Sequence, residues 1–249
     1  MDSKKKKILI ISPTPTHPQN AGNRIRIFSF CELLKKFGHE VHYLYSEQEK
    51  YDPAAMNEYW EEKLYTVPYD WKKYGIDSIQ KTKKRTGIRK RFEDWLHPDR
   101  EYLSKVDDHF NVEIYDFIRE KELYKEFDVV IVEYIFQSKA FELFPNSALK
   151  ILDTHDIMTN RHKMFQKIGK EPHWYSTTKK EEAKALNRAD RIIAIQEQEK
   201  NFFRKLTKKK IVTIGHPVDL HEIEIPDEPR NKLLFVGSVN KINLYSIQD

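Results

Sequence analysis

The sequence has little of what would mark it as a disulfide-stapled, membrane-spanning or secreted protein. Its 249 residues include one cysteine, Cys31, so no disulfide can form within the chain, and the cytosol is the simplest compartment. No apolar run approaches the roughly 20 residues that span a bilayer. The basic start MDSKKKK leads into only four apolar residues, which is too short a run for a signal peptide.

Several common motifs are absent as well. With only seven glycines, the chain has no GxGxxG fingerprint of dinucleotide binding. It has no HExxH motif and no cysteine cluster, and Asp153 and Asp156 lack D-x-D spacing, so we expect no metal. The net charge of +5 is a small excess in a chain with 44 basic and 39 acidic residues, and it does not by itself indicate nucleic acid.

The segment Lys7–Val41 is the most informative part of what is present. The continuous apolar run 8–11 predicts a strand that is covered on both faces. A loop and an amphipathic helix follow, and Gly38 supplies a left-handed residue that ends the helix. The apolar face of this helix is expected to contain Ile27, Phe30, Cys31, Leu34 and Phe37.

Strand patterns recur along the chain with helical patterns between them. This alternation predicts an α/β fold with a doubly wound, parallel, Rossmann-like sheet. A long insertion, about 70–125, separates the third and fourth strands and is expected to form two or three helices. The predicted strands are Lys7–Ser12, Glu40–Tyr45, Lys63–Val67, Phe127–Glu133, Ala148–Asp153, Arg191–Gln196 and Lys210–Gly215.

A basic stretch lies inside the insertion. KTKKRTGIRKR, residues 81–91, has seven basic residues in eleven positions, and apolar residues at helical spacing continue to Leu96. One interpretation is that 81–96 is a basic amphipathic helix lying on an anionic membrane. The other is a solvated helix whose apolar edge packs on the domain. Gly87 weakens both helical interpretations.

Two groups of polar residues follow predicted strands at the ligand-binding edge of such a sheet. In the first loop, Gly22 allows a close approach to the start of a helix, and Arg24 could pair with phosphate or hydroxyl groups. The alternative is a simple turn residue and a surface side chain.

His155 follows the fifth strand between two carboxylates, which suits catalysis or substrate contact. Asp156 and Arg161 lie beside it in the sequence, and Glu133 closes the fourth strand, where it could accept bonds from sugar hydroxyls. A loop histidine and an ordinary strand-end carboxylate are the alternatives.

The carboxyl-terminal part reads as a separate unit. The proline-rich stretch 217–231 suits an extended linker between a domain at 1–216 and a further strand with a glycine loop, within 232–249. Only eleven residues follow Ser238, so this second domain is expected to be incomplete.

Taken together, six segments resemble the amino-terminal half of a GT-B glycosyltransferase of the retaining family 4 kind. They are PTPTHPQNAGNR, LLKKFGHEV, DTHDIMTNR, LNRADRIIAIQEQEKNFF, TIGHPVDL and, at the start of the second domain, LLFVGSVNKIN. The resemblance covers most of the chain outside 70–125. It departs from the family pattern in having Ala21-Gly22 where two glycines are common, and His216-Pro217 where Asn-Gly is common.

The resemblance implies transfer of a hexose from a nucleotide-sugar to a glycan or lipid-linked acceptor, in polysaccharide or glycoconjugate synthesis, without a metal or other cofactor. His155 would contact the transferred sugar, and Gly22 the phosphates or the acceptor. Gly237 and Ser238 would lie on the donor-phosphate side.

The family's remaining donor-site residues would lie beyond residue 249. We therefore expect the chain to be a truncated gene product, or one half of a split transferase completed by another polypeptide, and to be inactive alone. The competing hypothesis is a non-catalytic Rossmann-like module that binds a glycan or lipid acceptor. Either protein would be cytoplasmic, with peripheral contact at the inner membrane face through 81–96 as an option, and no recognised motif supports nucleic acid binding.

Overall fold

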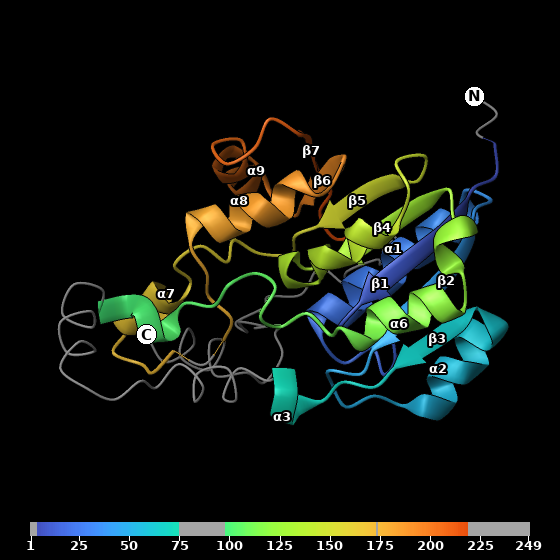
Figure 1. Ribbon diagram of the computed structural model, residues 1–249, viewed down its shortest axis with the longest axis horizontal. Coiled ribbons are helices and arrows are strands. Elements are labelled where there is room, and N and C mark those ends of the chain that lie inside the picture. The colour runs from blue at the N-terminus through green and yellow to red at the C-terminus, as the bar shows by residue number, and fades with distance from the viewer. Residues whose placement is uncertain (1–3, 75–97, 173, 219–249) are drawn as a thin grey trace, which may run out of the picture.

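A computed structural model describes residues 4–74, 98–172 and 174–218 of the chain (Figure 1). The basic stretch 81–91, most of the expected linker and the expected start of the second domain, with Gly237 and Ser238, lie outside the described residues.

The described residues form one seven-stranded sheet in which all strand pairs are parallel. The strand order is β3-β2-β1-β4-β5-β6-β7, so the chain winds outward from β1 in one direction and from β4 in the other. This confirms the predicted doubly wound fold. The strands are β1 (Lys7–Ser12), β2 (Glu40–Ser46), β3 (Leu64–Val67), β4 (Val129–Glu133), β5 (Leu149–Asp153), β6 (Arg191–Ala194) and β7 (Lys210–Thr213).

Helices cover both faces of this sheet (Figure 1). One face is covered by α1 (Gly22–Lys36) and α2 (Pro53–Trp60), and the other by α6 (Glu113–Glu120), η4 (Ile135–Leu143), α8 (Lys179–Asn187) and α9 (Glu197–Phe203). The remaining short helices are η1 (Glu61–Lys63), α3 (Trp71–Tyr74), η2 (Pro98–Tyr102), η3 (Leu123–Lys125) and α7 (His162–Lys167).

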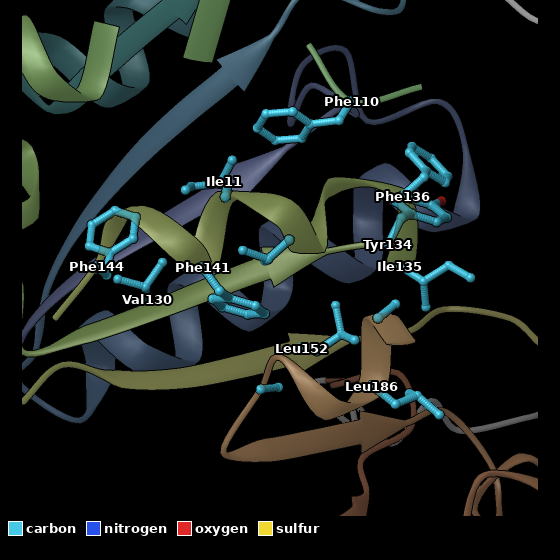
Figure 2. Packing of buried hydrophobic residues seen from close by; sticks show 14 of the residues in the cluster. Ile11, Phe110, Val130, Tyr134, Ile135, Phe136, Phe141, Phe144, Leu152 and Leu186 are labelled. Atoms are coloured by element: carbon cyan, nitrogen blue, oxygen red, sulfur yellow. The ribbon is translucent and has the colours of Figure 1, made fainter. Parts of the chain in front are cut away.

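The two cores follow from the alternation of side chains along each strand. In β1, Leu9 and Ile11 join the core under η4, whereas Ile8 and Ile10 join the core under α1. Figure 2 shows the first of these cores, in which aromatic side chains such as Phe141 and Phe144 pack near Val130. A strand that is buried on both faces needs a continuous apolar run, and β1 and β4 each contain such a run, at 8–11 and 129–132.

Helix α1 follows its predicted pattern with one exception. Ile27 and Cys31 are fully buried, and Gly38 has a φ of +84°, as a left-handed helix end requires. The prediction for Phe37 was wrong, because this side chain is 63% exposed. Phe37 is the C-cap residue after Lys36, so it lies past the last helical turn that faces the sheet.

Within the described residues, no helix combines the length and the apolar character that crossing a bilayer requires.

Candidate functional site

Two buried carboxylates lie side by side where β4 and β5 end. Glu133 and Asp153 are register partners on these adjacent parallel strands, and both are fully buried. Uncompensated carboxylates would be very costly in such a place, because burial removes the water that stabilises their charge. Their neighbours must therefore supply positive charge or protons.

Arg26 supplies one of the positive charges. It extends from α1 so that its Nη1 lies 2.5 Å from Oδ2 of Asp153, and the side chain is 2% exposed. Its Nη2 donates to the carbonyl of Ile214, 3.2 Å away, just after β7. The guanidinium thus ties α1 to β5 and to the segment that leaves the sheet.

His155 supplies the second basic group. Its Nε2 lies 2.6 Å from Oε2 of Glu133, and its ring stacks on Tyr134 with centroids 4.2 Å apart. Burial alone would lower the pKa of His155, but the charges of Asp153 and Glu133 outweigh it and raise this pKa.

Burial, together with Asp153, also raises the pKa of Glu133 against the opposing influence of His155 and Arg26. Both partners of the Glu133–His155 bond therefore favour keeping a proton, and the pair retains it at a pH where an exposed histidine would lose it.

The backbone is strained at Tyr134, next to Glu133, and at His155 itself. Tyr134 and His155, each of which follows a strand end, have φ values of +68° and +61°, a region that non-glycine residues rarely occupy. Such residues cost on the order of 1–3 kcal/mol each and persist where the surrounding structure fixes them. Here the two positive φ values accompany the stacking of the Tyr134 and His155 rings beside the ends of β4 and β5.

The first loop reaches the same place through Tyr134. Asn23, in the first turn of α1, donates through Nδ2 to the hydroxyl oxygen of Tyr134, 3.2 Å away. The loop is held in shape from β2 and α2, since Tyr43 donates to the Thr14 carbonyl at 2.6 Å and Trp60 donates to Oγ1 of Thr16 at 2.8 Å. The loop is therefore preorganised.

Some polar atoms of the cluster lack partners. Among the described residues, Oε1 of Glu133, Oδ1 of Asp153 and Nε of Arg26 are buried and make no hydrogen bond within the chain. Because buried polar groups are nearly always satisfied, these two carboxylate oxygens require donors from a ligand or from water. Hydroxyl groups are donors of the right kind.

The cluster also contains a set of atoms that could bind a metal ion. Glu133, Asp153 and His155 each offer a ligand atom, and these atoms lie within 4.8 Å of one another. However, Arg26 already lies against Asp153, so a metal ion would be placed beside a guanidinium. Arg26 and a protonated His155 balance the two carboxylates without one. Transfer without a metal therefore stays our prediction.

The other predicted site residues lie outside this cluster. Arg24 donates from Nη2 to Oε2 of Glu49 at 2.8 Å and to the Lys50 carbonyl at 2.8 Å, so it braces the segment after β2. Asp156 and Arg161 pair with each other at 3.1 Å in the loop after β5.

Gly22 begins α1 with room around it. A Cβ placed there would meet no atom within 4 Å, so packing does not require a glycine. The N-cap residue Ala21 gives this helix no side-chain cap, and its first turn has no acidic residue. Free N–H groups in such a place favour an anionic ligand.

A shallow cavity of about 670 Å³ lies beside Arg24 rather than beside His155. Its lining consists of residues 47–51 and Trp71, and Glu49 connects it to the first loop by accepting from Oγ1 of Thr14 at 3.0 Å.

Sequence reasoning missed Arg26, Asn23 and Tyr134. For Arg26 a signal existed, because it lies four residues before Phe30 on the apolar side of the predicted helix, where an arginine needs a buried anion. Asn23 and Tyr134 gave no signal, since their bond joins residues 111 positions apart.

No protein-family model matches the chain, and no curated protein matches its sequence. Solved structures do show similarity. An alpha-glucosyltransferase in complex with UDP and a 13-mer DNA has 11% identity and a TM-score of 0.46, with 87% of this chain and 44% of that chain covered. The sucrose-phosphate synthase from Thermosynechococcus elongatus has 14% identity and a TM-score of 0.48, with coverage of 85% and 48%. UGT2 of Phytolacca americana, complexed with UDP-2fluoro-glucose and pterostilbene, has 9% identity and a TM-score of 0.44, with coverage of 86% and 54%.

The chain thus spans about half the length of these solved chains. With identities of 9–14% and TM-scores below 0.5, the similarity concerns the path of the backbone only. It assigns no activity or substrate to this chain. At that level, the structures that resemble this chain are GT-B glycosyltransferases, the class that the sequence motifs predicted.

Proposed function

We propose that the chain forms the acceptor side of a retaining glycosyltransferase, which moves a sugar from a nucleotide-sugar to a glycan or lipid-linked acceptor. The observation that carries this proposal is the buried cluster of Glu133, Asp153, His155 and Arg26 at the carboxyl edge of the sheet. Parallel α/β sheets bind their ligands at this edge.

In this proposal His155 contacts the transferred sugar. Because Nε2 is bonded to Glu133, the ring offers Nδ1 to the substrate. A histidine that keeps its proton donates from Nδ1 to a sugar hydroxyl and places positive charge near the departing diphosphate. The partnerless oxygens of Glu133 and Asp153 would accept bonds from sugar hydroxyls.

The remaining residues orient this group. Arg26 and Asp153 fix the end of β5, and Tyr134 fixes the plane of the imidazole by stacking. The uncapped start of α1, at Gly22, is the place for an anionic group such as a phosphate. No step in this scheme needs a metal ion.

The test compares His155→Asn with the matched substitution His39→Asn. Asparagine tolerates the left-handed backbone of residue 155, so this variant should fold. His39 lies just before β2, at the opposite edge of the sheet, and controls for loss of an imidazole. Binding of UDP-, GDP- and ADP-sugars and of glycan and lipid acceptors is measured by saturation-transfer NMR. Because we expect the chain to be inactive alone, incorporation of labelled sugar into these acceptors is measured with the donor-binding half supplied as a second polypeptide.

Loss of one well-placed hydrogen-bond donor typically lowers a rate about 100- to 1,000-fold. We expect that loss of transfer for His155→Asn and near-normal transfer for His39→Asn, with both variants folded at the temperature of the assay. Acceptor binding without transfer, even with the donor-binding half supplied, would instead favour the non-catalytic binding module. Equal transfer by the two variants would contradict the role given to His155.

A further inference from the structure

A buried carboxylate outside the His155 cluster holds the segment 154–159, which follows β5 and which we call the His155 loop. Glu182, in the first turn of α8, is fully buried. Its Oε1 accepts from the amide of Met158 at 2.8 Å, and its Oε2 accepts from the amide of Thr159 at 3.0 Å and also from the hydroxyl of Thr159. All three bonds therefore come from neutral donors in two consecutive residues of the His155 loop.

The charge of Glu182 makes these bonds strong. A carboxylate has two acceptor oxygens and no donor, so it can receive several N–H and O–H groups at once. Bonds to an ionised acceptor are roughly twice as strong as bonds between neutral groups. Burial raises the pKa of Glu182, and its three hydrogen bonds oppose that rise. The conformation of residues 158 and 159 thus depends on a group that is costly to bury.

The start of α8 is a rigid base for this carboxylate. Thr178 caps the helix by accepting from the Glu181 amide at 3.2 Å, and Glu181 accepts from the Val106 amide at 3.0 Å. Ala185, one turn further along, is fully buried in the core under the sheet. A side chain that is supported in this way holds its partners at a fixed place.

The opposite end of the His155 loop is fixed at β6. Thr154 donates to the Ile193 carbonyl from its amide at 3.1 Å and from its hydroxyl at 2.9 Å. His155 lies between this attachment and Glu182, and only residues 156 and 157 separate it from Met158. Its φ of +61° is a strained conformation, which persists where the surrounding structure fixes it.

Other bonds hold the outer part of the loop to the residue before α8's cap. The Thr177 amide donates to the Met158 carbonyl at 2.9 Å, and the Asn160 amide donates to the Thr177 carbonyl at 2.9 Å. These bonds do not involve Glu182. They should keep the loop folded when Glu182 is replaced, so that a replacement displaces the loop rather than unfolding it.

We propose that Glu182 is a positioning residue for His155. By fixing residues 158 and 159, it holds the imidazole in its stack with Tyr134 and against Glu133, where the ring can contact the transferred sugar. The effect on sugar transfer rests on the proposed function, whereas the effect on the place of the ring does not.

The experiment follows the His155 ring by NMR in the full chain, prepared with isotope-labelled histidine. Ring protons that lie against the face of another aromatic ring resonate upfield, so the stack with Tyr134 gives His155 a distinct signal. The variant His155→Asn lacks this signal and thereby assigns it. The test variant is Glu182→Gln, which keeps the length of the side chain but replaces one acceptor oxygen by a donor.

The control variant is Glu181→Gln. Glu181 also lies in the first turn of α8 and also accepts from a backbone amide, but that amide belongs to Val106 rather than to the His155 loop. It therefore controls for the loss of an acidic residue near a helix start and for the loss of a bond to a loop amide.

We expect the His155 signal of Glu182→Gln to move toward the position of a histidine in an unfolded peptide, and that of Glu181→Gln to stay at the parent position. With the donor-binding half supplied, Glu182→Gln should lower kcat by up to about 100-fold, as a misplacement of about 1 Å can do. The KM for the acceptor should change little, because Glu182 contacts no substrate.

A second pair of variants tests the same contact with a smaller change. Thr159→Val removes the hydroxyl that Glu182 accepts, whereas Thr159→Ser retains it. The His155 signal should move in Thr159→Val, by less than in Glu182→Gln, and should stay at the parent position in Thr159→Ser.

An unmoved His155 signal in Glu182→Gln would overturn the proposal, and so would an equal movement in Glu181→Gln. If Glu182→Gln does not fold, the Thr159 pair decides, and equal signals in its two members count against a positioning role. A displaced ring in a chain whose parent shows no transfer would support the role of Glu182 and contradict the proposed transfer alone.

Discussion

At His155, an imidazole and a carboxylate hold each other away from water. The ring is 4% exposed, and its partner Glu133 is fully buried. Neither group would be stable there with an unbalanced charge, and Arg26 and Asp153 complete a set of two acids and two bases. Removing one member leaves the others unbalanced, so the four side chains act as a unit.

The raised pKa of His155 predicts a pH dependence of stability. Its pKa is raised in the folded chain, so folding favours the protonated ring, and this contribution is complete below the unfolded value of about 6.5. The contribution is lost as the pH rises through the folded pKa. Glu133 acts in the same direction, because its pKa is raised too.

Urea denaturation of the parent and of His155→Asn, from about pH 6 to about pH 9, measures this effect. We expect the difference in free energy of unfolding to fall as the pH rises, with a slope of up to about 1.4 kcal/mol per pH unit for one proton. A difference that is constant with pH would show that the ring titrates as it does in the unfolded chain.

At the scale of the element, helix α1 contributes both to a hydrophobic core and to the His155 cluster. Its apolar face fills the core under β1 and β2, its first turn holds Asn23 against Tyr134, and Arg26 reaches the end of β5. A single helix therefore positions side chains at the ends of β4 and β5. Its start contacts the site, whereas its end is set by the left-handed backbone of Gly38.

The glycines at the two ends of α1 should respond in opposite ways to alanine. Gly38→Ala should lower the free energy of unfolding by about 1–2 kcal/mol, because residue 38 has a φ of +84°. Gly22→Ala should leave it unchanged or raise it by about 0.4–1 kcal/mol, since no atom obstructs the new methyl group. Urea denaturation of both variants measures this.

The same Gly22→Ala variant also tests ligand binding, because it is expected to change the binding site without lowering the stability of the fold. Under the proposed function, the methyl group should hinder an anionic ligand at the start of α1 and weaken nucleotide-sugar or acceptor binding. Unaltered binding would make Gly22 an ordinary turn residue.

At the scale of the whole molecule, the strand order predicts which backbone amides are most protected from hydrogen exchange. In the part of the chain that the structure describes, β1 and β4 lie at the centre with a strand on each side, whereas β3 and β7 are the outermost strands. Native-state hydrogen exchange should therefore show central amides opening only with global unfolding, and edge amides opening locally at lower free energy. Equal protection across all seven strands would contradict this order.

The strands could be predicted because local patterns specify them. Ile8 to Ile11 and Val129 to Val132 are continuous apolar runs, and such runs become central strands of parallel sheets. The short strands at the carboxyl-terminal side end earlier than predicted, since β6 stops at Ala194 and β7 at Thr213. Strand ends depend on the length of the neighbouring strand, which a local pattern does not contain.

The site was predictable only in outline. Strand ends of a parallel sheet meet at one edge, so the sequence placed Glu133 and His155 near each other without indicating their bond. The positive φ of His155 depends on its packing against Tyr134. The place of Arg26 on the apolar side of its helix indicates a buried anion, but nothing local identifies that anion as Asp153, 127 positions away.

The central position of β1 also affects how the chain folds as it is synthesised. The first hydrogen bonds between the β1 and β4 regions, such as that from the Lys7 amide to Asp128, join residues 121 positions apart. Ribosomes add about 5–20 residues per second, so one edge of an apolar strand waits on the order of ten seconds for its partner. During that interval the unpaired edge is a template for strands of other nascent chains. Slower initiation, which spaces the ribosomes on a message, should therefore increase the yield of folded protein.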